Sequence, residues 1–291
     1  MLPARAADAP PREPRLPTFL VIGAPKAGTT SLHNYLGAHP EVFMPETKEL
    51  NFFVAELNWS RGRDWYERQF EAALDAKAVG EASPLYTQHP HYRGVAERAA
   101  GLVPEAKLIY LVRDPLAQML SHYADRRRWG SERRPVGKAL LDDPVYLETA
   151  RYAFQLEQFL AHFPRERVHV VLSERLRSVE TRAGALAGIL RFLGVDDHWT
   201  SGAIAEEHNV GIATRRWLFQ RLAGTRSWQT LAAGAPDWLK RPLSPIVHRG
   251  REPRDELGDR MAAELAARLH DDRARLRDLV GPDVDAWALG A

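Results

Sequence analysis

A short apolar run followed directly by a glycine-rich loop constrains the fold of this chain more than any other feature. Residues 19–22 read FLVI, and residues 23–31 read GAPKAGTTS. An apolar run of this length that ends at a glycine is typical of a buried strand, and the hydroxyl residues after Gly28 are typical of a helix start. A loop at such a junction presents free backbone N–H groups and the positive end of the helix dipole to an anion. An ordinary strand–turn–helix corner has the same spacing, so the spacing alone leaves both interpretations open.

Further apolar runs predict the rest of a sheet. We expect buried parallel strands at 18–23, 78–81, 107–114 and 167–174. Segments of helical length lie between and after them, at 30–38, 88–101, 115–127, 146–163, 180–195 and 255–280. Strands that alternate with helices indicate a parallel sheet covered on both faces. The sequence therefore predicts an α/β fold with three layers, in which a P-loop-like parallel β-sheet is flanked by helices.

Length and composition set the domain organisation. The 291 residues are 45% hydrophobic, which is typical of a globular chain. We predict a disordered N-terminal tail over 1–17, which holds five prolines, and a single domain over 18–291. No apolar stretch approaches the ~20 residues that a membrane span needs, and the tail has no hydrophobic region of the signal-peptide kind. We therefore expect a cytoplasmic protein without an integral membrane segment.

Charge and cysteine content exclude several kinds of function. The formal net charge is only +2, so no general affinity for nucleic acid is expected. The chain has no cysteine, which excludes disulfides, thiolate metal sites and cysteine nucleophiles. The oligomeric state cannot be predicted from these features.

The loop differs from the phosphate loop of nucleotide triphosphatases in the position of its cation. That motif, G-x-x-x-x-G-K-[ST], requires lysine where this chain has Thr29, and the lysine here is Lys26. Transfer of a phosphoryl group from a nucleoside triphosphate needs Mg²⁺ and that lysine. A donor with one phosphate and one sulfuryl group carries less charge, so amide groups and one lysine can bind it without a metal. In such a site Lys26 would stabilise the charge that develops on the leaving group.

Two segments together resemble a known family. APKAGTTSL at 24–32, followed by HPEVFMPETKELNFF at 39–53, resembles the sulfotransferases that use 3′-phosphoadenosine 5′-phosphosulfate, in particular the Golgi-type carbohydrate branch and its bacterial relatives. The resemblance runs from about Thr18 to Trp287. It implies this nucleotide as donor, adenosine 3′,5′-bisphosphate as product, and no metal. The family's loop pattern P-K-[AGS]-G-T-[TS] implies contacts to the 5′-phosphosulfate from Lys26, Ala27, Gly28, Thr29, Thr30 and Ser31.

A second motif matches the family's site for the 3′-phosphate, R-D-P-x-x-R-x-x-S-x-Y. Residues 108–123 read LIYLVRDPLAQMLSHY, so Arg113 follows a buried strand and Ser121 lies about two turns along the next helix. An arginine fork with a hydroxyl suits a phosphate monoester. The resemblance implies that these two residues bind the 3′-phosphate. Gln118 replaces the family's second arginine, and we interpret it as a structural variation.

Other parts of the resemblance are weaker. Residues 80–86, GEASPLY, resemble the family's G-E-K-[ST]-P-x-Y, but Ala82 stands where the family has a lysine, so no role of that lysine carries over. Arg175 replaces the aspartate of a strand-end motif. Arg215 or Arg216 lies where relatives place a loop over the 3′-phosphate, and which of them contacts it stays open.

Transfer to an alcohol needs a base beside the acceptor hydroxyl. The carbohydrate branch uses a glutamate in a segment like KELNFF, which implies Glu49 as the base here. We expect Phe52 and Phe53 to limit the access of water to this carboxylate. Glu46 and Glu81 are rival carboxylates.

Histidine is the base in cytosolic members of the family, and the chain has 11 histidines. None of them lies in a motif that connects it to the site. We expect His33 and His122 to lie on helix surfaces.

Three classes of function are compatible with these motifs. The favoured one is a metal-independent sulfotransferase with Lys26 and Glu49 as catalytic residues. The alternatives are a P-loop kinase or nucleotide hydrolase, and a non-catalytic nucleotide-binding protein of the same fold. The acceptor is a carbohydrate or small molecule whose identity the sequence does not give. Its walls are expected in segments 54–70, 124–150 and 210–253, with four tryptophans as candidates for stacking: Trp59, Trp65, Trp129 and Trp217.

Overall fold

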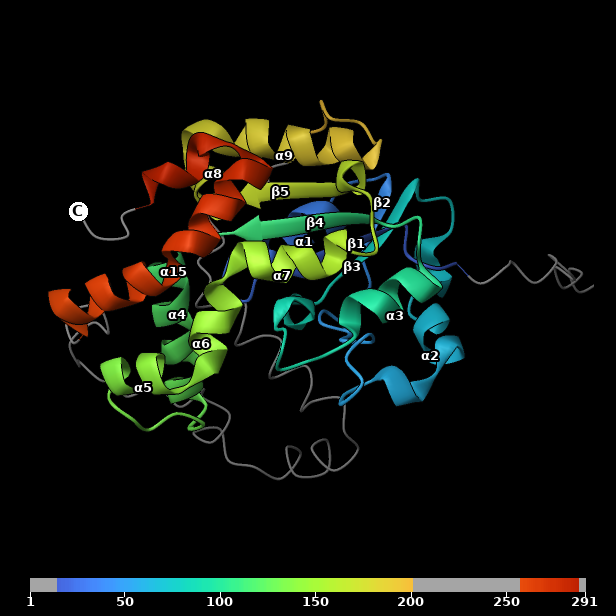
Figure 1. The fold of residues 1–291 in the computed structure, drawn as a ribbon. Coiled ribbons are helices and arrows are strands. Elements are labelled where there is room, and N and C mark those ends of the chain that lie inside the picture. Colours follow the sequence, from blue (N-terminus) through green and yellow to red (C-terminus); the bar gives the residue numbers. More distant parts are fainter. Residues whose placement is uncertain (1–14, 201–256, 288–291) are drawn as a thin grey trace, which may run out of the picture.

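A computed structural model describes residues 15–200 and 257–287 of the chain (Figure 1). Within these residues one sheet of parallel strands is present, in the order β2-β3-β1-β4-β5. Its strands are β1 (Phe19–Gly23), β2 (Val42–Phe43), β3 (Ala78–Ala82), β4 (Lys107–Val112) and β5 (Val168–Leu172). The four strands expected from apolar runs are thereby confirmed, and the short β2 is an addition.

The helices of the described residues connect and cover these strands. They are α1 (Thr29–Gly37), α2 (Arg63–Arg68), α3 (Val95–Leu102), α4 (Pro115–Arg128), α5 (Val136–Asp142), α6 (Pro144–Ala150), α7 (Tyr152–Leu160), α8 (Ser173–Arg177), α9 (Val179–Leu193) and α15 (Asp259–Val280). Short 3₁₀ turns are η1 (Trp59–Arg61), η2 (Glu71–Ala73), η3 (Pro84–Thr87), η4 (Arg165–Arg167) and η5 (Pro282–Ala286). No helix within the described ranges is long and apolar enough to cross a membrane.

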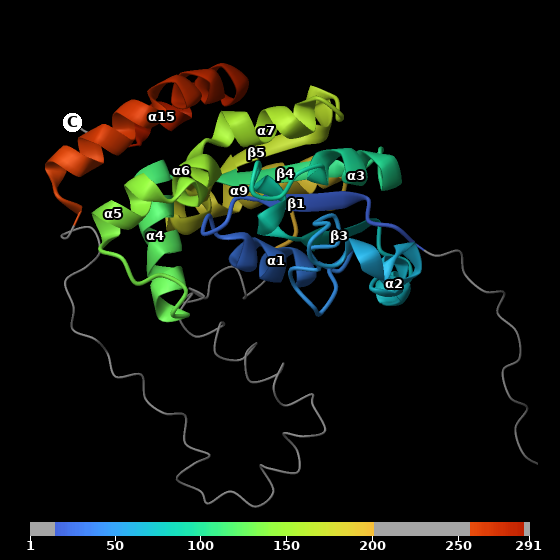
Figure 2. The same cartoon turned by 60° about the horizontal axis from the view of Figure 1, so that its bottom comes forward.

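The sheet is the middle of three layers. Helices α3 and α7 lie on one face and α1 lies on the opposite face, as the turned view shows (Figure 2). Helix α9 packs against β5, and α15 packs against α7. β1 is buried along its whole length, which is why its sequence is continuously apolar. The expected three-layer α/β fold is confirmed.

A second, smaller core fixes α4. Met119 and Tyr123 of α4 pack with Leu140 of α5, Tyr146 of α6 and Leu269 of α15, all of them buried. Helix α4 begins at a proline, and the Asp114 side chain caps it by accepting a hydrogen bond from Ala117 N at 2.7 Å. The helix that carries the second donor motif is therefore held at its start and along its length.

Parallel register brings four strand ends to one edge of the sheet. Val21 of β1 pairs with Ala82 of β3 and with Ile109 of β4, and Val112 of β4 pairs with Leu172 of β5. Ligands of open α/β sheets bind at the carboxyl ends of the strands. The segments that follow β1, β3, β4 and β5 therefore form the edge where a site is expected.

Two predicted helices differ from those observed. The expected helix at 88–101 begins only at Val95, because Pro90 interrupts the backbone hydrogen-bond ladder and Gly94 starts the helix with φ 68°. The expected helix at 146–163 is divided at Arg151, whose φ and ψ of −81° and 77° are not helical, into α6 and α7. Helix α5 was not predicted. The segment 224–253, expected to be irregular, lies outside the described residues.

Candidate active site

The loop after β1 has the geometry of an anion site. Gly28 has φ 99°, a left-handed conformation that favours glycine, and helix α1 begins directly after it. No side chain caps this helix start, so the first backbone N–H groups point out of it without a side-chain acceptor. Thr29 is buried, Ser31 is half-buried and Thr30 is exposed. The loop thus offers backbone donors and hydroxyls of the kind that bind a phosphate or sulfate.

Three contacts hold Lys26 and the preceding Pro25 in place. Its own φ is 65°, and its carbonyl accepts a hydrogen bond from Arg113 at 3.3 Å. Gln118 Nε2 donates to the neighbouring Pro25 carbonyl at 3.0 Å. The Lys26 ammonium pairs with Asp125 of α4 at 3.1 Å. The contacts of Arg113 and Gln118 therefore join the loop directly to the segment around the start of α4.

Gln118 and Asp125 have contacts that the sequence interpretation did not assign. Gln118, interpreted above as a structural variation, is fully buried and binds the loop backbone. Gln118, Ser121 and Asp125 follow one another at spacings of three and four residues along α4, so their side chains share one face of the helix. That spacing was visible in the sequence and indicates a face directed at the loop.

Glu174 of α8, the helix that directly follows β5, fixes the start of α4. Glu174 Oε1 accepts a hydrogen bond from Asp114 N at 2.9 Å. Arg113 therefore lies between two fixed points, the loop on one side and the β5 end on the other.

Glu49 lies beside the end of β3. Its backbone N–H donates to the Ala82 carbonyl at 3.1 Å, and its side chain pairs with Lys48 at 2.7 Å. The Glu49 side chain is 43% exposed and that of Lys48 11%. The expectation that Phe52 and Phe53 limit the access of water to Glu49 is wrong, because both rings are buried in the core while the carboxylate faces solvent.

The rival carboxylates occupy contrasting environments. Glu46 is exposed. Glu81 is buried, with 1% of its surface exposed, and its oxygens accept hydrogen bonds from Tyr66, Tyr86 and Ser83. Burial raises the pKa of Glu81, while these hydroxyl donors and the Lys48 charge oppose the rise. A carboxylate enclosed in this way has no free face for an acceptor hydroxyl.

His33 and His122 are not surface residues, contrary to expectation. Both are half-buried, and each has a buried Nδ1 for which the described residues supply no hydrogen-bond partner. Burial, and then the Lys48 charge, lower the pKa of His33 to about 4. Burial, and then the charges of Arg126 and Lys26, lower the pKa of His122 to about 4. Both imidazoles are therefore neutral at pH 7, and each is near enough to a lysine, Lys48 or Lys26, for that charge to lower its pKa.

These histidines predict a loss of stability in acid. The unfolded chain binds a proton at each histidine near pH 6.5, whereas the folded chain does so only near pH 4. Their contribution is thus present above pH 6.5 and is lost as the pH falls towards 4, by at most roughly 3 kcal/mol for each histidine. Urea unfolding of the His33→Gln and His122→Gln variants should show a weaker pH dependence between 6.5 and 4.5 than the unaltered chain. His162→Gln, at an exposed position, should not change the slope; equal slopes in all four proteins contradict the prediction.

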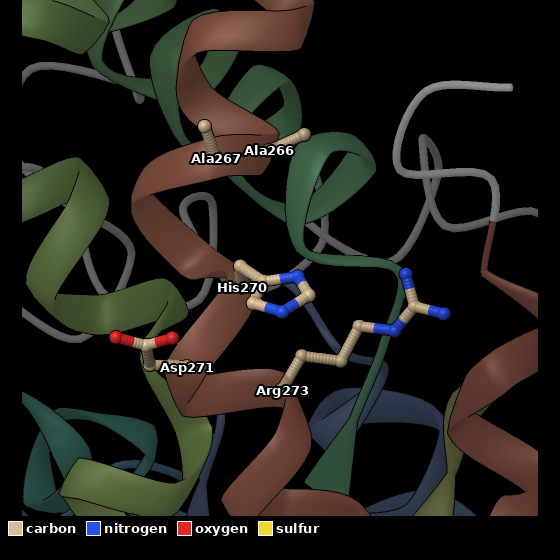
Figure 3. A pocket seen from close by; sticks show the side chains of 5 residues that line it. All are labelled: Ala266, Ala267, His270, Asp271 and Arg273. Carbon is tan, nitrogen blue, oxygen red and sulfur yellow. The ribbon is translucent and has the colours of Figure 1, made fainter.

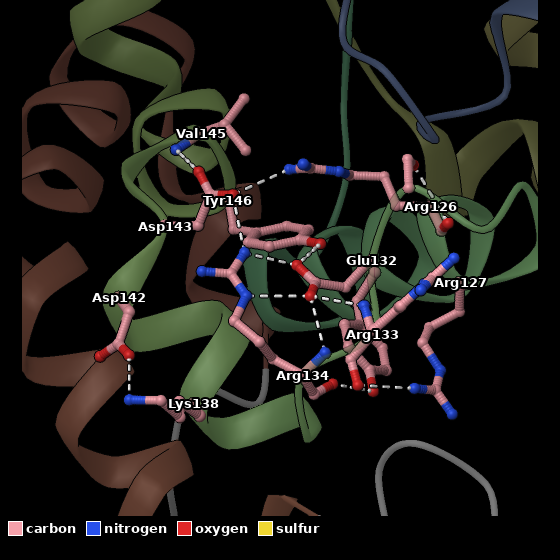
Figure 4. A network of polar contacts seen from close by, with 12 residues as sticks. Arg126, Arg127, Glu132, Arg133, Arg134, Lys138, Asp142, Asp143, Val145 and Tyr146 are labelled. Atoms are coloured by element: carbon pink, nitrogen blue, oxygen red, sulfur yellow. Dashed lines mark hydrogen bonds and ion pairs between the residues drawn. The ribbon is translucent and has the colours of Figure 1, made fainter.

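Ion pairs fix the segment that follows α4. Glu132 is buried and accepts hydrogen bonds from Arg134, which lowers the pKa of Glu132 to about 2. Arg134 and Arg126 also share Asp143, as the dashed lines in Figure 4 show. Two arginines of the expected acceptor wall are thus engaged in structural contacts.

The tryptophans named as stacking candidates differ in exposure. Trp129, at the end of α4, is 52% exposed, and Trp59 is 39% exposed. Trp65 is partly buried against the main core and lies under the Arg61 guanidinium. Trp217 lies outside the described residues, as do Arg215 and Arg216. Trp129 and Trp59 therefore remain the candidates for contact with an acceptor.

A hollow of about 410 Å³ lies apart from these residues. It is lined only by side chains of α15: Ala266, Ala267, His270, Asp271 and Arg273 (Figure 3). None of the residues predicted for the site lines it. Groups of three or more side chains that could hold a metal ion do not occur within the described ranges.

Comparison with known proteins bears on the family and the fold. The family model described as "Sulfotransferase domain" matches residues 16–225. A crystal structure of a sulfotransferase from Alicyclobacillus acidocaldarius has a similar fold, with a TM-score of 0.68 and 24% identity, over 94% of this chain and 99% of that chain.

Curated relatives are longer than the chain. The chain is 38% identical over 117 residues to the membrane-associated sulfotransferase kil1 of Dictyostelium discoideum, covering 39% of this chain and 24% of that protein. It is 31% identical over 211 residues to the human bifunctional heparan sulfate N-deacetylase/N-sulfotransferase 3, covering 64% and 23%. It is 30% identical over 175 residues to the human heparan sulfate glucosamine 3-O-sulfotransferase 5, covering 56% and 49%. The chain thus spans from about a quarter to half of the length of these relatives. Because the family model matches more than half of the chain, the chain belongs to the sulfotransferase domain family.

Proposed function

We propose that this chain transfers a sulfuryl group from 3′-phosphoadenosine 5′-phosphosulfate to a hydroxyl of a carbohydrate or small-molecule acceptor. The observation that carries the proposal is the position of Lys26 in the loop before α1, where Arg113 donates to the Lys26 carbonyl and Gln118 donates to the carbonyl of the preceding Pro25. The kinase alternative requires a lysine at the position of Thr29, and Thr29 is a buried threonine. The cytoplasmic location stays a prediction.

Two groups of residues would hold the donor. The 5′-phosphosulfate would be bound by the side chain of Lys26 and by the loop from Ala27 to Ser31, whose helix start offers free N–H groups. The 3′-phosphate would be bound by Arg113 and Ser121, which lie at the strand edge and on the α4 face described above. Arg215 or Arg216 would add to this second group.

Two residues would assist the transfer, one at the attacking oxygen and one at the leaving oxygen. Glu49 would accept the proton of the acceptor hydroxyl while that oxygen forms a bond to sulfur. The bond from sulfur to the oxygen that bridges it to the 5′-phosphate breaks, and Lys26 would stabilise the negative charge left on that oxygen. The products are the sulfated acceptor and adenosine 3′,5′-bisphosphate. No metal takes part in this scheme.

Transfer of label tests the proposal directly. The chain is incubated with donor labelled in its sulfuryl group and with a panel of sugars, glycans, phenols and other alcohols. Label should appear in at least one acceptor, and EDTA should not reduce the rate. Phosphoryl transfer from ATP that depends on Mg²⁺, without sulfuryl transfer to any acceptor, would establish the kinase alternative instead.

The 3′-phosphate site gives a binding prediction. Arg113→Ala should weaken the binding of adenosine 3′,5′-bisphosphate by about 10- to 100-fold, since a charge-assisted hydrogen bond is worth ~1.5–3 kcal/mol. Adenosine 5′-phosphate, which lacks the 3′-phosphate, should lose much less affinity. Calorimetric titration of both nucleotides measures the difference. Equal weakening of the two would mean that Arg113 acts only by holding the Lys26 carbonyl.

A further inference from the structure

Glu81 is a buried carboxylate that the proposed reaction does not use. It lies in β3, and its partners Tyr66 and Tyr86 pack against the rings of Phe52 and Phe53. Within the described part of the chain no lysine or arginine nitrogen lies within ion-pair distance of it, although the charge of Lys48 is near enough to affect its pKa. A charge in such a place is costly unless every oxygen accepts hydrogen bonds.

Three hydroxyl groups supply those hydrogen bonds. Tyr66 and Tyr86 donate to Glu81 Oε1 at 2.8 and 2.5 Å, and Ser83 donates to Oε2 at 2.6 Å. A carboxylate only accepts hydrogen bonds, and a hydroxyl has only one proton to give. As long as Glu81 is ionised, its charge therefore fixes the direction of all three hydroxyls.

Two of these hydroxyl oxygens also accept hydrogen bonds from the backbone of a nearby segment. With its proton given to Glu81, the Ser83 oxygen accepts a hydrogen bond from Asn51 N at 2.9 Å. The Tyr86 oxygen in the same way accepts one from Phe52 N at 3.0 Å. These bonds hold the segment that directly follows Glu49.

This segment has a conformation that needs support. Glu49 has φ 63° and Asn51 has φ 47°, and both are left-handed values that non-glycine residues adopt at a cost. Such residues persist only where their surroundings determine the backbone. Here the Ala82 carbonyl holds Glu49 N, and the hydroxyls of Ser83 and Tyr86 hold the N–H groups of Asn51 and Phe52.

We propose that Glu81 is a positioning residue that acts on catalysis through Glu49, by orienting the hydroxyls of Ser83 and Tyr86 as acceptors for the segment 49–52. This inference rests on the proposed function, because it assigns Glu81 a role in placing the base of that reaction. Glu81 does not contact the acceptor or the donor. Its charge is needed because a neutral side chain of the same shape cannot accept three hydroxyl protons.

The chain offers variants with a matched control. Glu81→Gln keeps the shape but places an N–H₂ group where one oxygen accepted a proton, so at least one hydroxyl must reverse. Ser83→Ala and Tyr86→Phe each remove one acceptor for the segment. Tyr66→Phe removes a donor to Glu81, but among the described residues the Tyr66 hydroxyl bonds to Glu81 and not to the backbone of the segment, and the stacking of its ring on Phe52 at 4.2 Å is kept. Tyr66→Phe is therefore the control variant: it weakens the hydrogen bonding of Glu81 but leaves both acceptors for the segment in place.

The expected result separates positioning from stability. Glu81→Gln and Tyr86→Phe should lower kcat about 10- to 100-fold, with the Kd for adenosine 3′,5′-bisphosphate within about twofold of the unaltered chain, whereas Tyr66→Phe should change kcat less than about threefold. Ser83→Ala should behave like Tyr86→Phe. Thermal melting identifies any variant that fails to fold, and kcat and Kd are then compared among the variants that do fold.

A double-mutant cycle decides the route by which Glu81 acts. In a Glu49→Gln background the further change Glu81→Gln should lower kcat less than about threefold, because the group that Glu81 positions is already lost. A full additional loss in that background overturns the proposal, as does an equal effect of Tyr66→Phe and Tyr86→Phe. If the unaltered chain transfers no sulfuryl group to any acceptor, it is the proposed function that fails, and the cycle is not needed to show it.

Discussion

Lys26→Ala should lower kcat by about 10²–10³, with the chain still folded, because the change removes a cation from the point where charge develops on the leaving group. Lys26 lies at the centre of the joined donor motifs, with its carbonyl bound by Arg113 and its ammonium paired with Asp125. The pair with Asp125 is about one third exposed, so the ammonium can leave it for a bound donor at little cost. Transfer of labelled sulfate at saturating donor measures the effect.

A lysine elsewhere provides the control for the loss of Lys26. Lys138 lies on α5 and pairs with Asp142 four residues along the same helix, at an exposed position. Lys138→Ala removes the same charge and should leave kcat within about twofold. The assignment of Lys26 is wrong if Lys26→Ala retains activity within about threefold of the unaltered chain, or if activity depends on a metal that EDTA removes.

The predictable parts of this structure are those determined by local chemistry. The continuous apolar character of Phe19–Ile22 follows from burial on both faces, and the left-handed Gly28 follows from the need to turn into a helix. Arg113 was placed at a strand end by the same reasoning, and the register confirms that this strand neighbours β1.

The parts that were mispredicted depend on contacts between distant segments. Phe52 and Phe53 were expected around Glu49. Instead, the Phe52 ring packs on Tyr66 and the Phe53 ring packs on Tyr86, inside the core. His122 looked like a surface residue on α4, yet Tyr146 of α6 covers it, with ring centroids 5.1 Å apart. Sequence periodicity shows which residues share a face of a helix, but it does not show which distant segment packs on that face or on a loop. Neither arrangement could therefore be predicted from the sequence.

Glu49→Gln is expected to lower kcat by about 10²–10⁴, the usual contribution of a general base. The amide has the shape of the carboxylate but cannot accept the hydroxyl proton. Glu49 is exposed at the strand edge, and its backbone N–H is bound to Ala82 at the end of β3, the strand next to β1 and its donor loop. The Kd for adenosine 3′,5′-bisphosphate should stay within about twofold, because no donor contact is assigned to this side chain.

Two neighbours sharpen the test of the base. Lys48 pairs with Glu49, so Glu49→Gln also leaves the Lys48 ammonium without its carboxylate. Lys48→Met separates the two effects: if the ion pair only orients Glu49, kcat should fall about 10-fold or less, well short of the Glu49→Gln effect. Glu46→Gln, at an exposed position in the same segment, should leave kcat within about twofold. A Glu49→Gln variant with nearly full kcat, beside an inactive Glu46→Gln, would assign the base to Glu46, because proton transfer from the acceptor requires a carboxylate that solvent and acceptor can reach.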